Sequence, residues 1–306
     1  MNTLTEILKI ALRHTPPPAS YPPVPSETAI PGVSIFRVDA PPAPIPGVYE
    51  PLYGLVLSGR KRVQLGQTVH ELGPGDGFLV TVDQPVIGTI LEAGPGSPYA
   101  TFALKLDLTA LAAIELDSEV AAFSTPDSGL GFRIDAASHR TMDACLRLAQ
   151  LLDEPGDIRV LAPLVQRELL YRLMTGPLGA PLRAILRTED PMNRVAGAVA
   201  WLRNNFRREF QANEVARAAR MSVSTLNRRF RLVTSMSPLE FQKHLRLQEA
   251  RRLLMTDAAD VAAVGRAVGY SNSSQFSREY RRLFGEPPGR DAARLRSRSD
   301  DAAREF

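Results

Sequence analysis

The 306-residue chain has one cysteine and no long apolar run. A single cysteine excludes a disulfide scaffold and any zinc or iron–sulfur site built from several cysteines, and Cys145 lies on an apolar helical stripe that predicts a core position. No run approaches the ~20 apolar residues that cross a bilayer, and the N-terminus lacks the cleavage site of a secretory signal. We therefore expect a globular protein of the cytoplasm without a membrane segment.

Histidine is too scarce for a metal-dependent barrel enzyme, which needs about three His and a carboxylate around one ion. Of His14, His70, His139 and His244, only His70 lies in the β-rich part of the sequence. His70 and Glu71 are adjacent on a predicted strand, so their side chains point to opposite faces. We expect no catalytic residue, no metal site and no cofactor.

Lysine is nearly absent from the C-terminal third, where 21 of the 22 basic residues are arginine. Residues 1–189 carry a net charge of −5, whereas residues 190–306 carry +9. A basic module on an acidic remainder is typical of a nucleic-acid-facing unit attached to another domain. The guanidinium group suits both phosphates and bases, although charge alone leaves open a merely solvated arginine-rich surface.

Two patterns divide the chain and predict an α+β protein of two domains. Residues 33–106 contain short β runs separated by Gly- and Pro-rich turns, which is typical of a β-sandwich or small barrel. A helix is predicted at 3–13, a proline-rich extended arm follows at 16–31, and helical periodicity returns from about residue 137. The break at 176–181 places the boundary between an N-terminal domain, residues 1–180, and a C-terminal domain, residues 190–298.

The C-terminal domain is predicted to be all α and to contain an internal repeat. Helices are expected at about 191–205, 212–220, 223–233, 238–255, 260–268, 273–284 and 288–297, with Asp190 as the N-cap of the first. The pattern Ser224-x-Leu226-x-Arg228-x-Phe230 recurs 50 residues later as Ser274-x-Phe276-x-Arg278-x-Tyr280. Each copy is a short helix, a tight turn and a longer helix, which is the layout of a helix-turn-helix, here at about 212–233 and 260–284.

The second helix of each copy separates an apolar face from a polar one. Leu226 and Phe230 are four residues apart and share the buried face, as do Phe276 and Tyr280. The exposed face is predicted to carry Ser224, Thr225, Asn227, Arg228 and Arg231 in the first copy, and Ser273, Ser274, Gln275, Ser277, Arg278 and Arg281 in the second. Such side chains bond with base edges and phosphates, and two matched copies favour double-stranded DNA as the partner.

Residues 192–297 resemble the AraC/XylS family of transcriptional regulators. The similarity lies in ARAARMSVSTLNRRFRLVTSMSP, residues 216–238, and in VAAVGRAVGYSNSSQFSREYRRLFGEPP, residues 261–288. The resemblance implies seven helices, with two helix-turn-helix units joined by one long helix and two recognition helices entering major grooves about one turn (~34 Å) apart. The family usually has glycine where this chain has Arg220 and Ser235, and often an aromatic residue where it has Asp291.

The N-terminal part also resembles a known domain. YGLVLSGRKRVQLGQTVHELGPGDGFLVTVDQPVIG, residues 53–88, and SPYATFALKLD, residues 97–107, are similar to the sensor domain of one AraC-type subgroup. This resemblance implies a cupin-like barrel that binds a small-molecule effector, helices that form a homodimer, and RNA polymerase as a further partner. The interior polar groups expected to contact the effector are Arg37, Tyr49, Tyr53 and Tyr99, and the proline-rich arm is expected to fold over the pocket.

The leading hypothesis is a one-component, sequence-specific transcription regulator that is not an enzyme. Its effector must have different affinities for two states of the protein in order to shift them. The alternative is a cupin-type enzyme, such as a sugar-phosphate isomerase, carrying a DNA-binding tail; it needs convergent histidines and carboxylates that the sequence does not offer. A third hypothesis is an architectural DNA-binding protein without a ligand.

Overall fold

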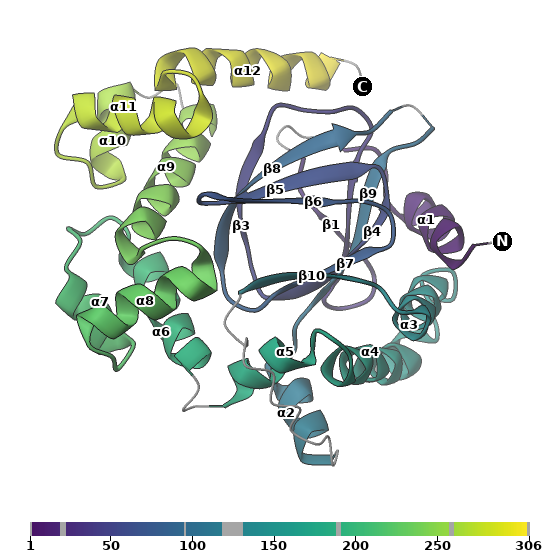
Figure 1. The fold of residues 1–306 in the computed structure, drawn as a ribbon. Helices are drawn as coiled ribbons and strands as arrows, with labels where there is room; N and C mark the ends of the chain where they lie inside the picture. Colours follow the sequence, from purple (N-terminus) through teal and green to yellow (C-terminus); the bar gives the residue numbers. More distant parts are fainter. Residues whose placement is uncertain are drawn as a thin grey trace.

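A computed structural model of the chain shows an α+β protein with a β-rich N-terminal domain and a helical C-terminal domain (Figure 1). This confirms the fold class predicted from the sequence. The structure describes residues 2–18, 23–94, 96–117, 131–187, 191–256 and 260–304.

Two antiparallel sheets form the N-terminal barrel. One has the strand order β1-β2-β9-β4-β7-β10, and the other has the order β3-β8-β5-β6. The strands are β1 Ser26–Glu27, β2 Val33–Val38, β3 Ile45–Tyr49, β4 Leu52–Ser58, β5 Arg60–Leu65, β6 Thr68–Leu72, β7 Asp76–Val80, β8 Gln84–Glu92, β9 Tyr99–Lys105 and β10 Phe132–Ala136. Because side chains alternate along a strand, one set, including Val63, Leu65, Val86 and Ile90, fills the space between the sheets.

Helices cover the outer face of the six-stranded sheet. They are α1 Thr3–His14, α2 Leu108–Asp117, α3 His139–Gln150, α4 Ile158–Thr175 and α5 Gly179–Leu186. The apolar stripes of α1, α3 and α4 pack against outward side chains of β2, β4 and β9. Cys145 is fully buried in this core, as predicted.

The proline-rich arm runs along a sheet edge where the structure describes it. Ser26 and Glu27 pair with Ile35 and Ser34 of β2, and Ile30 is buried in the outer core. This pairing satisfies backbone groups at the sheet edge, and Val24 of the same arm lines a pocket beside helix α9, Pro238–Thr256; that the arm folds over an effector pocket stays a prediction. Residues 19–22 lie outside the described chain.

Seven helices form the described part of the C-terminal domain. They are α6 Pro191–Asn205, α7 Ala212–Ala218, α8 Val223–Thr234, α9 Pro238–Thr256, α10 Val261–Ala267, α11 Ser273–Phe284 and α12 Pro288–Arg304. Each begins within one residue of its predicted start, although Asp190, the predicted N-cap of α6, lies outside the described residues. One core joins α6, α7 and α8, a second joins α10, α11 and α12, and α9 contributes to both (Figure 1).

Candidate nucleic-acid interface and ligand site

The two helix-turn-helix units repeat each other in backbone conformation. Arg220, in the turn between α7 and α8, has φ +50°, and Gly269, at the matching position of the second unit, has φ +97°. The next pair, Ser235 and Gly285, ends α8 and α11 with φ +60° and +84°. Arg220 and Ser235 thus keep a left-handed geometry that favours glycine, and the repeat predicted from side chains extends to the chain path.

Both recognition helices begin with a side-chain cap. Ser222 Oγ accepts a hydrogen bond from the Thr225 backbone N–H at 3.3 Å, and Asn272 Oδ1 accepts one from the Gln275 N–H at 3.0 Å. Such caps satisfy amide groups that a helix start leaves without partners. The predicted buried faces are confirmed, because Leu226, Phe230, Phe276 and Tyr280 have exposures of at most 1%.

The predicted contact residues lie at the surface of α8 and α11. Thr225 and Ser277 are half-buried, and the other nine are exposed: Ser224, Asn227, Arg228, Arg231, Ser273, Ser274, Gln275, Arg278 and Arg281. Among the described residues, none of these four arginines forms an ion pair. Their charges are therefore available to phosphates or bases. Of the eleven predicted contact residues, five lie on α8 and six on α11.

Two of the candidate amides are held by their own helices. Asn227 Nδ2 donates to the Val223 carbonyl at 3.0 Å, and Gln275 Nε2 donates to Glu279 Oε1 at 3.2 Å. An amide that reads adenine must present a donor and an acceptor to one base edge. Both side chains therefore have to rotate out of these bonds before they can contact a base.

A buried ion pair joins the second unit to the linker helix α9. Asp291, where the resembling family often has an aromatic residue, is fully buried. It accepts two hydrogen bonds from Arg251, at 2.8 and 3.2 Å, and one each from Tyr280 Oη and Arg294. Arg251 also donates to the carbonyl of Pro44 in the N-terminal domain at 3.0 Å. The polar residue is thus accommodated by a paired and hydrogen-bonded network rather than by a gap.

The barrel directly holds the last turn of α8. The Val233 carbonyl accepts hydrogen bonds from the Gly131 N–H at 2.8 Å and from Gln84 Nε2 at 3.0 Å. A carbonyl at a helix end has no partner inside the helix, so the N-terminal domain supplies the partners here. Arg203 of α6 also pairs with Asp83, at 2.5 Å.

Further contacts extend this interface along β8 and the β5–β6 hairpin. Gln248 of α9 donates to the Val86 carbonyl at 3.1 Å. Gly66, in the hairpin turn, lies so near the turn after α8 that a Cβ there would meet Met236 Cγ at 2.7 Å. We call this set of contacts, made by Gln84, Gly131, Asp83, Val86, Pro44 and Gly66 with α6, α8 and α9, the interdomain interface.

The structure separates the four expected effector contacts into two faces. Tyr49 and Tyr99 belong to the interior cluster between the sheets. Tyr53 is buried in the outer core beneath the helices, and Arg37 bonds to Asp39 and to the Thr15 carbonyl on the same outer side. The expectation of an interior position is therefore wrong for Arg37 and Tyr53, because a shift of one residue along a strand reverses the face.

Sequence reasoning missed an interior cation. Lys61 of β5 is 8% exposed, and its ammonium group donates to Tyr49 Oη at 2.5 Å. Burial lowers the pKa of Lys61 and raises the pKa of Tyr99 to about 12. The sequence of β5 could have predicted this position, because side chains alternate between the two faces of a strand and Lys61 shares its face with Val63 and Leu65.

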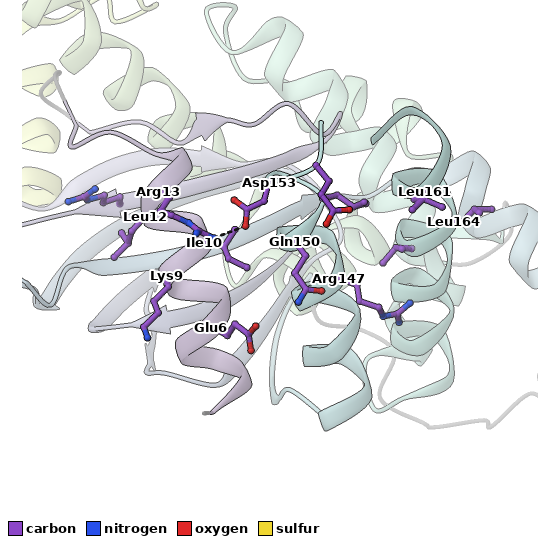
Figure 2. A pocket seen from close by; sticks show the side chains of 14 residues that line it. Glu6, Lys9, Ile10, Leu12, Arg13, Arg147, Gln150, Asp153, Leu161 and Leu164 are labelled. Atoms are coloured by element: carbon purple, nitrogen blue, oxygen red, sulfur yellow. Dashed lines mark hydrogen bonds and ion pairs between the residues drawn. The ribbon is translucent and has the colours of Figure 1, made fainter. Parts of the chain in front are cut away.

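An open groove lies on the outer side of the N-terminal domain (Figure 2), and Arg37 is one of its lining residues. The groove has a volume of about 1390 Å³ and lies between α1, α3 and α4. Two of its lining charges pair with each other, Arg13 and Asp153 at 2.6 Å, and Arg147 pairs with Glu168 outside the lining at 2.7 Å. Leu161 and Leu164 of α4 form an apolar wall at one side.

The described residues contain no group of three or more His, Cys, Asp or Glu placed to hold a metal ion. His70 is half-buried and its ring lies 5.2 Å from that of Phe132. Among the helices of the described residues, none combines the length and apolarity needed to cross a membrane.

Comparison with known families gives matches for both the N-terminal and the C-terminal domain. Residues 29–181 match the family described as the AraC-type transcriptional regulator N-terminus, and residues 215–294 match a helix-turn-helix domain. The transcriptional activator RhaS of Pectobacterium carotovorum is 32% identical over 94 residues, which cover 31% of this chain and 34% of RhaS. An Escherichia coli RhaS is 28% identical over 152 residues, which cover 49% of this chain and 54% of that RhaS.

These matches span about a third to a half of the length of the curated relatives. Among solved structures, an apo variant of ToxT from Vibrio cholerae aligns with a TM-score of 0.54 at 8% identity, covering 88% of this chain and all of that one. At such identity the likeness concerns the fold alone. Since the N-terminal family model covers half of the chain and the helix-turn-helix model covers the repeat, this chain belongs to the AraC-type transcriptional regulators.

Proposed function

We propose that this chain is a sequence-specific DNA-binding transcription regulator with a sensor domain at about 1–180 and a DNA-binding domain at about 190–298. Its reading units are residues 212–233 and 260–284. The proposal rests on the exposed arginines of α8 and α11, Arg228, Arg231, Arg278 and Arg281. They occupy matching positions of the 50-residue repeat, and within the described chain none of them forms an ion pair. Free guanidinium groups on a capped, surface helix are what groove readout requires.

The side chains divide into two roles by their chemistry. Arginine can bond with guanine, and an amide can bond with adenine, so we assign base contacts to Asn227, Arg228, Ser274, Gln275 and Arg278. Arg231 and Arg281 lie one turn further from the helix start and are assigned to phosphates. Ser224, Thr225, Ser273 and Ser277 complete the surface as short hydroxyl contacts to bases or backbone.

Alanine substitution separates the two roles. Arg228→Ala should weaken binding to the preferred DNA by about 5- to 150-fold, or 1–3 kcal/mol, and relax the preference at one base position. Arg231→Ala should weaken binding to all sequences alike and reduce the salt dependence. Fluorescence anisotropy at two salt concentrations measures both effects. Arg159→Ala, which removes an exposed arginine from the N-terminal domain, is the charge-matched control; equal losses in all three variants would refute the assignment.

We further infer that the barrel binds a small-molecule effector rather than converting it. The interdomain interface supports this role, because β8 contributes both to the barrel interior, through Val86 and Ile90, and to the hydrogen bonds with α8 and α9. A ligand that favours one packing of the interior thereby acts on the DNA-binding domain.

The same proposal places the protein in the cytoplasm as a homodimer that acts with RNA polymerase. An exposed apolar strip on α4 supports dimerisation. Val160 and Leu164 are 66% and 62% exposed, and Leu161 is 40% exposed, although the opposite side of the helix is buried. Exposed apolar side chains grouped on one helix face are typical of a contact with another subunit.

Changing the strip tests the dimer. Leu164→Glu should shift the protein from dimer to monomer at micromolar concentration, because the charge would be buried without a partner. Sedimentation velocity measures the change, and Val69→Glu, at an exposed apolar position of β6, is the control. A wild-type protein that sediments as a monomer would refute dimerisation through α4.

A further inference from the structure

Lys61 extends into the barrel and its ammonium group is surrounded by aromatic rings. Nζ lies 4.9 Å from the ring centre of Phe36, 5.1 Å from that of Tyr49 and 5.8 Å from that of Tyr99. Its neighbours at the inward positions of β5 are Val63 and Leu65. A cation therefore occupies a place in the interior cluster where the strand otherwise uses aliphatic side chains.

The neighbouring strand makes room for this lysine. Gly88 of β8 lies beside the Lys61 stem, and a Cβ at Gly88 would approach Lys61 Cε to 2.8 Å. Any other residue at position 88 would thus compete with the lysine for space. The pairing of a buried lysine with a glycine on the adjacent strand indicates that the sheet is built to hold the cation.

The charge of Lys61 lacks a counterion. Within the described residues, no carboxylate lies within ion-pairing distance of its ammonium group, and Tyr49 Oη is the only hydrogen-bond acceptor that it reaches. Rings attract a cation, but burial of a charge away from water has a larger cost unless the charge is paired and hydrogen-bonded. Lys61 is therefore poorly explained as a contribution to stability.

The surrounding hydroxyl groups also offer donors rather than acceptors. Tyr49 Oη accepts from Lys61, and Tyr99 Oη accepts from Thr101 Oγ1 at 2.7 Å. Each phenol therefore keeps its own O–H to donate. We call this group the Lys61 cage (Phe36, Tyr49, Lys61 and Tyr99); Lys61 and Tyr99 are buried, and Phe36 and Tyr49 are half-buried.

We propose that the Lys61 cage is the effector site of the barrel and that the effector is an organic carboxylate with a flat or apolar body. The inference rests on the proposed sensor function and names its ligand class. One cation and two phenolic donors match the single charge and two oxygens of a carboxylate, whereas the rings match an apolar body. A dianion would leave a net negative charge among apolar side chains.

The position of the cage connects it to the interdomain interface. Gly88, beside Lys61, and Val86, which accepts the bond from Gln248, are two residues apart on β8. Tyr49 ends β3, and its neighbour Val48 packs against the core of the first helix-turn-helix unit. A carboxylate that draws the Lys61 ammonium toward itself therefore acts on the two strands that contact the DNA-binding domain.

Thermal melting of the full chain tests the proposal with defined probes. Benzoate and octanoate are added at pH 7 to the wild type, to Lys61→Met and to Lys105→Met, an exposed lysine on β9. Benzamide and octanamide serve as uncharged isosteres. At least one carboxylate should raise the melting temperature of the wild type and of Lys105→Met by about 2 °C or more in a concentration-dependent way, and should not raise that of Lys61→Met. The amides should have no effect.

The ligand-free proteins provide a second readout. Lys61→Met should melt at or above the temperature of the wild type, because the substitution removes a buried charge that lacks a counterion. A lower melting temperature for ligand-free Lys61→Met would show a structural role and overturn the proposal. So would the absence of any carboxylate effect, or an equal effect in Lys61→Met or with the amides.

The proposed DNA-binding function is tested separately, by measuring the DNA affinity of the same proteins. Wild type that binds DNA specifically but shows no Lys61-dependent response to carboxylates refutes the ligand class and leaves DNA recognition standing. Loss of specific DNA binding in the wild type itself refutes the proposed function instead.

Discussion

Asp291 shows how one side chain can hold the second reading unit together. Its carboxylate is fully buried against Arg251, which is itself 4% exposed. Removing one partner of a buried pair leaves the other charge without compensation, at a cost of about 3–5 kcal/mol. Asp291→Asn should therefore lower the free energy of unfolding by roughly that amount, as measured by urea denaturation.

Asp143→Asn is the matched control for this substitution. Asp143 pairs with Arg147 on the surface of α3, and exposed pairs of this kind contribute about 0.3–0.5 kcal/mol. If Asp291→Asn lost no more stability than Asp143→Asn, the buried network would not support the fold as argued.

The same carboxylate gives stability a definite pH dependence. Burial alone would raise the pKa of Asp291, but hydrogen bonds from Arg251, Arg294 and Tyr280 outweigh it and hold the pKa below its ordinary value near 3.8. As the pH falls, the unfolded chain takes up this proton before the folded chain does. The contribution to stability is therefore present above the unfolded pKa and is lost as the pH falls through the folded pKa. Asp291→Asn should flatten this acid limb of the stability curve.

Individual side chains also mark the limit of what the sequence alone could predict. The buried faces of α8 and α11 follow from four-residue spacing, which is insensitive to small errors in helix ends. Arg37 and Tyr53 were misplaced because strand parity changes with every residue. Asp291 departs from the aromatic residue that the resembling family often has, and only its tertiary partner, Arg251 from 40 residues earlier, explains it.

At the scale of elements, the β5–β6 hairpin is a contact between domains. Gly66 has φ +58°, and a Cβ there would lie 2.9 Å from the Ser235 carbonyl as well as close to Met236. Gly66→Ala should push the hairpin from the turn after α8 and loosen it. Amide hydrogen exchange at residues 233–236 should become about tenfold faster, which corresponds to about 1.4 kcal/mol of local stability.

Gly75→Ala separates contact from turn strain. Gly75 also has a positive φ, +91°, in a barrel turn, but a Cβ there would meet no atom within 4 Å. The control therefore strains a turn of the same domain without touching α8. Equal acceleration of exchange in both variants would mean that the hairpin contact has no special role.

Elements of the C-terminal domain were more predictable than those of the barrel. Caps, prolines at helix starts and the 50-residue repeat predicted the starts of α6 to α12 to within one residue, because these signals are local. The end of α12, at Arg304, lies seven residues beyond its predicted end. The helices α2 and α5 escaped prediction. The helix α5 begins at Gly179, inside the break predicted at 176–181, because packing against the outer core outweighs the local signals for a loop.

At the scale of the whole molecule, the protein combines a packed barrel, an arginine-bearing reading surface and a hydrogen-bonded contact between them. The sequence predicted the first two from periodicity and charge. It carried no local signal for the interdomain interface, whose bonds join residues such as Gln84 and the Val233 carbonyl, 149 positions apart. That interface makes the state of the barrel relevant to the orientation of α8.

The central claim is that both units read DNA together, and selection from a randomised DNA library by the purified full chain tests it most directly. The selected sequences should contain two blocks of preferred bases about one helical turn, roughly 10 base pairs, apart. Arg228→Ala should erase preference in one block, and Arg278→Ala should erase it in the other. Selection of no shared motif, or of a single block that both variants affect equally, would contradict the account.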